Sequence, residues 1–121
     1  MTGEAMGKTI LIIEDDAEVL RVYTAILAEF GVVRKAETMA QARPQLQGVD
    51  LVILDYHLKN ETMKFEDIIA EIKPVAPILV CSGIPDSRIR AVGTQLGITG
   101  YWNKGLGLEG LRQKVRTILS A

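Results

Sequence analysis

The chain has little cysteine, no excess of charge of one sign and no long apolar run, and each shortage removes a class of structure. Its single cysteine, Cys81, excludes an internal disulfide and a zinc site built from several cysteines. Because Cys81 stands inside an apolar run, we expect a buried, reduced thiol. No apolar run approaches the roughly 18 residues that would cross a bilayer, and the N-terminal MTGEAMGK lacks the apolar centre of a signal peptide. A cytoplasmic location is the expectation that follows.

Charge is nearly balanced, with 14 Lys and Arg against 15 Asp and Glu and a net charge of -1. This balance gives no reason to expect direct contact with nucleic acid or with an anionic membrane. The 121 residues, 48% of them apolar, suit one compact domain without repeats or linkers. Function must therefore be sought in small groups of side chains.

Short apolar runs alternate five times with amphipathic stretches, which is the pattern of a β-α repeat. We expect strands at residues 9–13, 32–36, 50–54, 78–82 and 100–103. We expect helices at residues 17–30, 38–46, 64–73, 86–96 and 108–121, the second made irregular by Pro44. Right-handed crossovers then give an α/β fold with a doubly wound, five-stranded parallel sheet.

Polar side chains follow the apolar runs at the point where each strand ends. They are Glu14 and Asp15 after the first strand, Asp55 after the third, Ser82 at the end of the fourth and Lys104 after the fifth. In open α/β sheets, ligands bind outside the carboxyl ends of the strands, where the strand order reverses. For the order 2-1-3-4-5, the first and third strands are neighbours, so the three acids should converge.

Three converging carboxylates favour a bound cation. Each pair costs about 4 kcal/mol at roughly 4 Å and an effective dielectric of about 20. Oxygen ligands without clustered histidine or cysteine favour a hard ion, and room for water and phosphate oxygens suits Mg²⁺. Asp55 could then act as nucleophile on a phosphoryl group, while Lys104 and the Ser82 hydroxyl contact the phosphoryl oxygens.

These motifs resemble the receiver domain of two-component response regulators, with agreement in order along nearly the whole chain. The matching segments are ILIIEDD, DLVILD, LVCSG and GYWNK. The resemblance implies a flavodoxin-like (βα)5 fold, with a flexible N-terminus at residues 1–7 and the receiver domain at 8–121. It also implies a signalling domain, which is no enzyme beyond its own phosphorylation and dephosphorylation.

The resemblance assigns roles to the acids. Asp55 matches the phosphoaccepting aspartate, which takes its phosphoryl group from a sensor histidine kinase or a histidine phosphotransfer protein. Glu14 and Asp15 match the acids of the Mg²⁺ site, with Asp15 the more direct ligand. Asp55 and the backbone carbonyl of His57 complete the implied ligand set.

The resemblance also implies a switch. Ser82 matches the switch hydroxyl, Tyr101 the switch aromatic and Lys104 the lysine of the site. Their reorientation alters the surface of the fourth helix, fifth strand and fifth helix, through which a downstream protein target is contacted. Arg88 and Arg90 are expected on that surface.

The chain departs from the family pattern at three places. Gly105 replaces the usual proline, so we expect no cis peptide, a looser loop at Lys104 and retained activity. The segment YHLKNETMKFED lacks the usual proline and glycine and is short, so we expect the third helix or its preceding loop to be altered, with metal affinity affected most. His57 and Ile84 occupy the variable positions that tune loss of the phosphoryl group.

Other interpretations remain open on the residues alone. Each acid could merely cap a helix, and Lys104 could be an ordinary surface lysine. A receiver-like interaction module without phosphorylation is the main alternative. A small aspartate-nucleophile phosphatase would need a second acid where His57 stands, and a flavin-binding protein would need a Ser/Thr/Gly-rich phosphate loop where the chain has EDDAEV.

Overall fold

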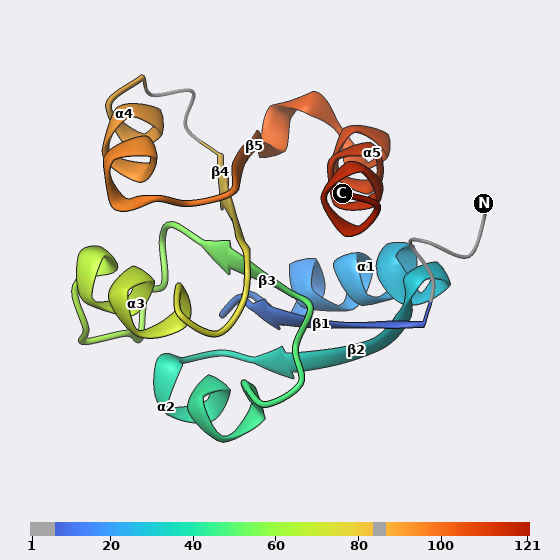
Figure 1. Ribbon diagram of the computed structural model, residues 1–121, viewed down its shortest axis with the longest axis horizontal. Coiled ribbons are helices and arrows are strands. Elements are labelled where there is room, and N and C mark those ends of the chain that lie inside the picture. Colours follow the sequence, from blue (N-terminus) through green and yellow to red (C-terminus); the bar gives the residue numbers. More distant parts are fainter. Residues whose placement is uncertain (1–6, 84–86) are drawn as a thin grey trace.

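The protein is described by a computed structural model that covers residues 7–83 and 87–121, without the side chains of 87–90, 92 and 106. A five-stranded parallel sheet lies between two layers of helices (Figure 1). The strands are β1 (Lys8–Ile13), β2 (Gly31–Ala36), β3 (Leu51–Asp55), β4 (Ile78–Ser82) and β5 (Gly100–Asn103). The helices are α1 (Ala17–Leu27), α2 (Met39–Ala42), α3 (Phe65–Ile72), α4 (Ser87–Leu96) and α5 (Leu108–Leu119).

The strand order is β2-β1-β3-β4-β5, as the sequence predicts. Both β3 and β4 are buried at every position, which explains their continuous apolar sequence, whereas β2 at the edge is partly exposed. The register pairs Ile13 of β1 with Leu54 of β3, and Asp55 of β3 with Cys81 of β4. The carboxyl ends of the three central strands are thereby level with one another.

Local sequence explains where the first helix begins and ends. The Asp16 side chain caps α1 by accepting hydrogen bonds from the backbone N–H groups of Glu18 and Val19. The helix passes into a 3-10 turn, η2 (Ala28–Phe30), and Gly31 follows with a φ of 140°. A Cβ at Gly31 would lie 2.1 Å from the Lys8 carbonyl oxygen, so only glycine fits where the chain enters β2.

The second predicted helix is shorter than the sequence pattern indicates. The Thr38 hydroxyl caps α2 through the Gln41 N–H, and α2 spans four residues. It continues as a 3-10 turn, η3 (Arg43–Gln45), which contains Pro44. Proline has no N–H to continue the α-helical hydrogen bonds, which accounts for the change.

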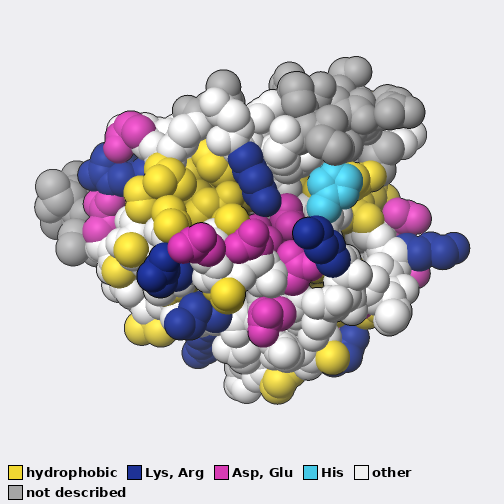
Figure 2. Space-filling model, turned by 180° about the vertical axis from the view of Figure 1, so that it is seen from behind, with side chains coloured by type: hydrophobic (Ala, Val, Ile, Leu, Met, Phe, Trp, Pro, Cys, Tyr) yellow, Lys and Arg dark blue, Asp and Glu magenta, His cyan; other side chains and the backbone are white. Residues whose placement is uncertain are grey.

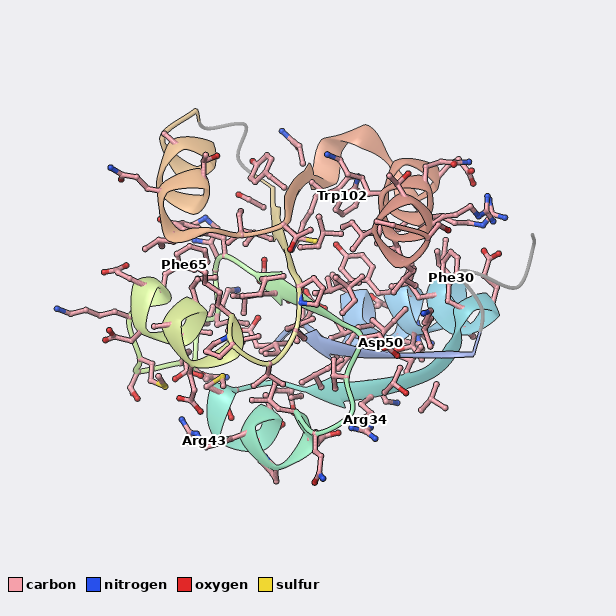
Figure 3. All side chains as sticks on the ribbon, in the orientation of Figure 1. Phe30, Arg34, Arg43, Asp50, Phe65 and Trp102 are labelled. Carbon is pink, nitrogen blue, oxygen red and sulfur yellow. The ribbon has the colours of Figure 1, made fainter. Side chains whose placement is uncertain are left out.

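Two apolar cores cover the two faces of the sheet. Phe65 lies on the side of α2 and α3, whereas Phe30 and Trp102 lie on the side of α1 and α5 (Figure 3). The Trp102 ring meets the Tyr23 ring edge to face at 6.0 Å, and burial raises the pKa of the neighbouring Cys81 thiol. Tyr101 packs against the opposite core, so adjacent residues of β5 serve opposite faces.

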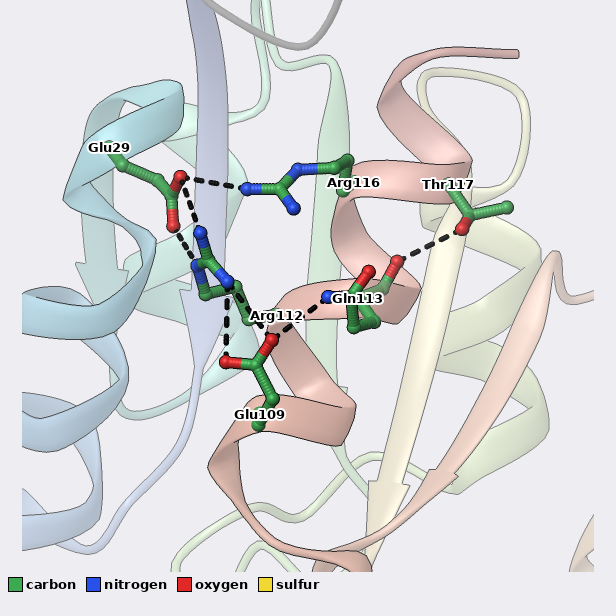
Figure 4. A network of polar contacts seen from close by, with 6 residues as sticks. All are labelled: Glu29, Glu109, Arg112, Gln113, Arg116 and Thr117. Atoms are coloured by element: carbon green, nitrogen blue, oxygen red, sulfur yellow. Dashed lines mark hydrogen bonds and ion pairs between the residues drawn. The ribbon is translucent and has the colours of Figure 1, made fainter.

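An ion-pair network joins α5 to the 3-10 turn η2, which directly follows α1 (Figure 4). The Glu29 carboxylate accepts hydrogen bonds from the guanidinium groups of Arg112 and Arg116, the latter at 3.1 Å. Arg112 also contacts Glu109 at 3.0 Å. These contacts tie two helices that are far apart in the sequence.

Side chains make hydrogen bonds at part of the open edge of the sheet, near β2. The Gln45 amide donates hydrogen bonds to the Lys35 carbonyl at 2.9 Å and to the Gln41 carbonyl at 3.1 Å. The Arg34 guanidinium donates to the carbonyls of Gln45 and Gln47, both at 2.7 Å. In the part of the chain that is described, no helix is both long and apolar enough to cross a membrane.

Candidate functional site

Three carboxylates gather at the carboxyl ends of β1 and β3. Glu14, Asp15 and Asp55 each offer an oxygen, and these oxygens lie within 4.8 Å of one another. Glu14 and Asp55 are only 2% and 5% exposed, and Asp15 is half-buried. Figure 2 shows acidic side chains on this face, with basic side chains and the single histidine of the chain beside them. The sheet thus brings the predicted acids together.

Lys104 is the cation of this cluster. Its Nζ lies 3.2 Å from Glu14 Oε1 and 3.1 Å from Asp55 Oδ1. Partial burial opposes the ionised form, but Asp55 and Glu14 outweigh it and raise the pKa of Lys104. One ammonium stands against three carboxylates, so the group keeps an excess of negative charge.

The protonation of Glu14 is strongly affected by its burial and by its charged neighbours. Burial, and then the neighbouring Asp55, raise the pKa of Glu14 to about 7. The Asp16 N–H, 3.1 Å from Glu14 Oε2, and the Lys104 ammonium act in the opposite direction. The site therefore holds its carboxylates under mutual repulsion, which a bound cation would relieve.

Asp55 carries a buried oxygen whose partner is the ammonium group of Lys104. This atom is Oδ1, which lies 3.1 Å from the Lys104 Nζ. The end of β3 is fixed by the Tyr56 N–H, which donates to the Cys81 carbonyl at 2.9 Å. A buried carboxylate beside one ammonium and two further acids is suited to a metal ion or a reacting group.

The carboxylate of Asp15 has a partner that sequence reasoning missed. Its Oδ2 accepts a hydrogen bond of 2.5 Å from the backbone N–H of Lys59, in the loop after β3. A backbone amide leaves no mark in residue type or spacing, so only the fold could reveal it. His57 lies in the same loop, exposed, with its ring 4.8 Å from that of Tyr56.

The remaining predicted residues lie on β4 and β5 and in the loops that follow. Ser82 is fully buried at the end of β4 and pairs in register with Asn103, directly before Lys104. Tyr101 is half-buried on β5. Ile84 lies outside the described residues, as do the side chains of Arg88 and Arg90.

The loop at Lys104 has a trans backbone, as expected from Gly105. No cis peptide bond occurs among the residues described. Lys104 begins a 3-10 turn, η4 (Lys104–Leu106), and the Asn103 side chain caps it by accepting the Gly105 N–H at 2.8 Å. The sequence predicted a looser loop here because Gly105 replaces the usual proline. The Asn103 hydrogen bond instead fixes the start of this loop.

The protein has a doubly wound parallel sheet, with acids and a lysine at the carboxyl ends of its strands. These features are those of the α/β class whose sites lie at the carboxyl edge of the sheet. The chain matches the model of the response regulator receiver domain over residues 10–116, and it belongs to that family. It is therefore a receiver domain of the kind found in two-component systems.

Solved structures agree with this assignment at the level of the fold. The BeF3-activated DrrB receiver domain is 22% identical, with a TM-score of 0.85 and coverage of 96% of this chain and 100% of that one. A two-component response regulator from Clostridium difficile is 26% identical, with a TM-score of 0.82 and coverage of 93% and 95%. The non-phosphorylated HemR receiver domain from Leptospira biflexa is 23% identical, with a TM-score of 0.82 and coverage of 94% and 95%. No curated protein sequence matches the chain.

Proposed function

We propose that this chain is a phosphoacceptor receiver in which Asp55 takes a phosphoryl group from a histidine kinase or a histidine phosphotransfer protein. The observation that carries the proposal is the convergence of the buried Asp55 carboxylate with two further acids and with the Lys104 ammonium, 3.1 Å from Asp55 Oδ1. This arrangement leaves a carboxylate oxygen available for bond formation and places a cation next to it.

The residues of the site suit Mg²⁺. The proposed ligands are oxygens only, namely the carboxylates of Glu14, Asp15 and Asp55 and the backbone carbonyl of His57. The close approach of three carboxylates and the raised pKa of Glu14 both favour a cation there. When bound, Mg²⁺ would offset the negative charge of the carboxylates and of the phosphoryl oxygens.

The side chains divide the work of phosphoryl transfer. An Asp55 oxygen forms a bond to phosphorus while the bond from phosphorus to the imidazole nitrogen of the donor breaks, and the electron pair stays on that nitrogen. Lys104 neutralises charge on a phosphoryl oxygen, and the Ser82 hydroxyl donates to another.

The output is a change of protein partners. We assign Ser82 and Tyr101 to the switch, because they lie on the adjacent strands β4 and β5 beside the site. Their movement would alter the surface of α4, β5 and α5, where a downstream target would bind. Apolar side chains also gather next to acidic side chains on this face of the molecule (Figure 2), and the donor protein would dock there. These contacts would take place in the cytoplasm.

The test is intact mass after incubation with acetyl phosphate, with and without Mg²⁺. We expect a gain of one phosphoryl group that requires Mg²⁺ and is absent from Asp55→Asn. Asp67→Asn, which changes an exposed aspartate in the first turn of α3, is the matched control and should be modified like the wild type. No gain in the wild type, where a known receiver is modified, would instead favour an interaction module without phosphorylation.

A further inference from the structure

The loop between β3 and α3 is held at both of its sides. At its start the Tyr56 N–H is bonded to β4, and three residues later the Lys59 N–H is bonded to Asp15. A tight turn follows, in which the Glu61 N–H donates to the Leu58 carbonyl at 3.3 Å. The loop therefore has a defined shape, although it lacks the proline and glycine that the family pattern has there.

The Glu61 side chain supplies the second support of this loop. Its Oε1 accepts the Met39 N–H at 2.5 Å, and its Oε2 accepts the N–H groups of Thr62 and Met63, both at 3.0 Å. Met39 is the first residue of α2, and the Thr38 cap serves Gln41 instead. One carboxylate thus ties the loop after β3 to the start of a helix on another part of the chain.

This carboxylate is half-buried and ionised in the folded protein. Burial by itself would raise the pKa of Glu61, but the three backbone N–H groups, from Met39, Met63 and Thr62, and the guanidinium of Arg43 lower it. Charge-assisted hydrogen bonds of this kind are stronger than neutral ones. Glu61 is therefore suited to hold the loop in one conformation.

We propose that Glu61 is a positioning residue for the cation site, acting through the loop that carries His57 and Lys59. This inference rests on the proposed Mg²⁺ site. Between the Tyr56 amide and the Glu61 turn, the loop has few conformations left, so the His57 carbonyl and the Lys59 N–H are placed before a cation arrives. Without Glu61, binding would have to order the loop at an entropic cost.

Coupling of this kind works in both directions. If Glu61 links the loop to α2, then a cation that shifts the loop must also change the environment of the Met39 amide. The Met39 amide is a useful reporter because it donates to Glu61 and is not one of the proposed ligands. Loss of its response in a Glu61 variant would show that the response passes through Glu61.

The experiment is a Mg²⁺ titration of the ¹⁵N-labelled full chain followed by NMR. Outer-shell partners of metal ligands typically contribute about 10- to 100-fold in affinity, and Glu61 lies one step further out. We therefore expect Glu61→Ala to raise the Kd for Mg²⁺ about three- to tenfold. In the wild type the Lys59 and Met39 amide signals should both shift with Mg²⁺, and the Met39 response should be lost in the variant.

Two further variants separate the hydrogen bonds from charge. Glu37→Ala removes an exposed carboxylate just before α2 and should leave the Kd unchanged. Glu61→Gln removes the charge but keeps one acceptor oxygen, so its Kd should lie between those of the wild type and Glu61→Ala. A rise in the Kd for Glu37→Ala equal to that for Glu61→Ala would assign the effect to net negative charge and overturn the proposal.

A positioning role also predicts a split in kinetics. At saturating Mg²⁺, Glu61→Ala should be phosphorylated by acetyl phosphate at the wild-type rate, whereas general damage to the fold would lower that rate as well. A folded Glu61→Ala with the wild-type Kd would overturn the inference, as would a wild type that does not bind Mg²⁺. Neither Mg²⁺ result depends on phosphorylation, so failure of the proposed function would be recognised separately in the mass experiment.

Discussion

At the scale of single residues, the buried carboxylates of the site make the folded protein less stable unless a cation lies beside them. Glu14 and Asp55 are buried with a shared ammonium, and the contacts of Lys104 are the main attraction that holds them. Removing one partner of such a group leaves charges buried without compensation, which is costly. Lys104 is thus as important for the fold as for the phosphoryl group that we expect it to contact.

We predict that Lys104→Met destabilises the protein in the absence of divalent cations. The loss should be about 1 to 3 kcal/mol, below the usual range for a fully buried pair because the lysine is 27% exposed. Saturating Mg²⁺ should recover part of the loss by supplying positive charge. Urea unfolding of both proteins, with and without Mg²⁺, measures this.

Lys59→Met removes an exposed lysine and keeps the backbone amide, so it should change stability by less than about 0.5 kcal/mol.

The same scale shows which parts of the site the sequence could predict. Glu14, Asp15, Asp55 and Lys104 were predicted to converge because each ends or follows a strand, and parallel strands share an edge. The amide of Lys59 was not predicted, since every residue but proline has one. Glu61 was not predicted either, because its partners lie 22 residues away at Met39 and in its own turn.

At the scale of elements, periodicity predicted the sheet better than the helix ends. The strand β4 has its predicted bounds because Pro77 and Gly83 flank an apolar run. The α2 segment is short because Pro44 interrupts its hydrogen bonds. The helix α1 passes into the 3-10 turn η2 before Gly31, and the close approach of Gly31 to Lys8 joins residues that are far apart in the sequence.

The link between α1 and α5 predicts a pH-dependent contribution to stability. The hydrogen bond from Arg112, supported by Arg116, lowers the pKa of Glu29. For a carboxylate whose folded pKa is lowered, the stabilisation is present above its ordinary pKa and is lost as the pH falls through the folded value. Glu29→Gln should therefore be less stable than the wild type near neutral pH, with the difference vanishing in acid.

Urea unfolding of both proteins across that pH range gives the measurement. The effect should be modest and should shrink in high salt, since these groups are partly exposed. Glu18→Gln, which breaks a pair with Arg21 inside α1, is the control for loss of an acid without loss of the link between helices. An equal pH dependence in both variants would show that the link contributes nothing of its own.

At the scale of the whole molecule, one domain contains the acids, the switch residues and the surface that would report on them. We predict that phosphorylation changes hydrogen exchange in α4, β5 and α5 and leaves β1 and β3 unchanged, because the central strands are buried on both faces. Mass spectrometry of peptides, after treatment with acetyl phosphate and Mg²⁺, measures this. Changes that persist in Asp55→Asn would contradict the proposed switch.

The side chains at the β2 edge affect how readily two molecules could associate through their sheets. An uncovered edge strand offers its amides and carbonyls to any passing β-strand, which is how sheets of separate molecules fuse into aggregates. Here Gln45 occupies the Lys35 carbonyl, and the charged side chains of Arg34 and Lys35 lie along the same strand. These features oppose the pairing of a β-strand from a second molecule with this part of β2.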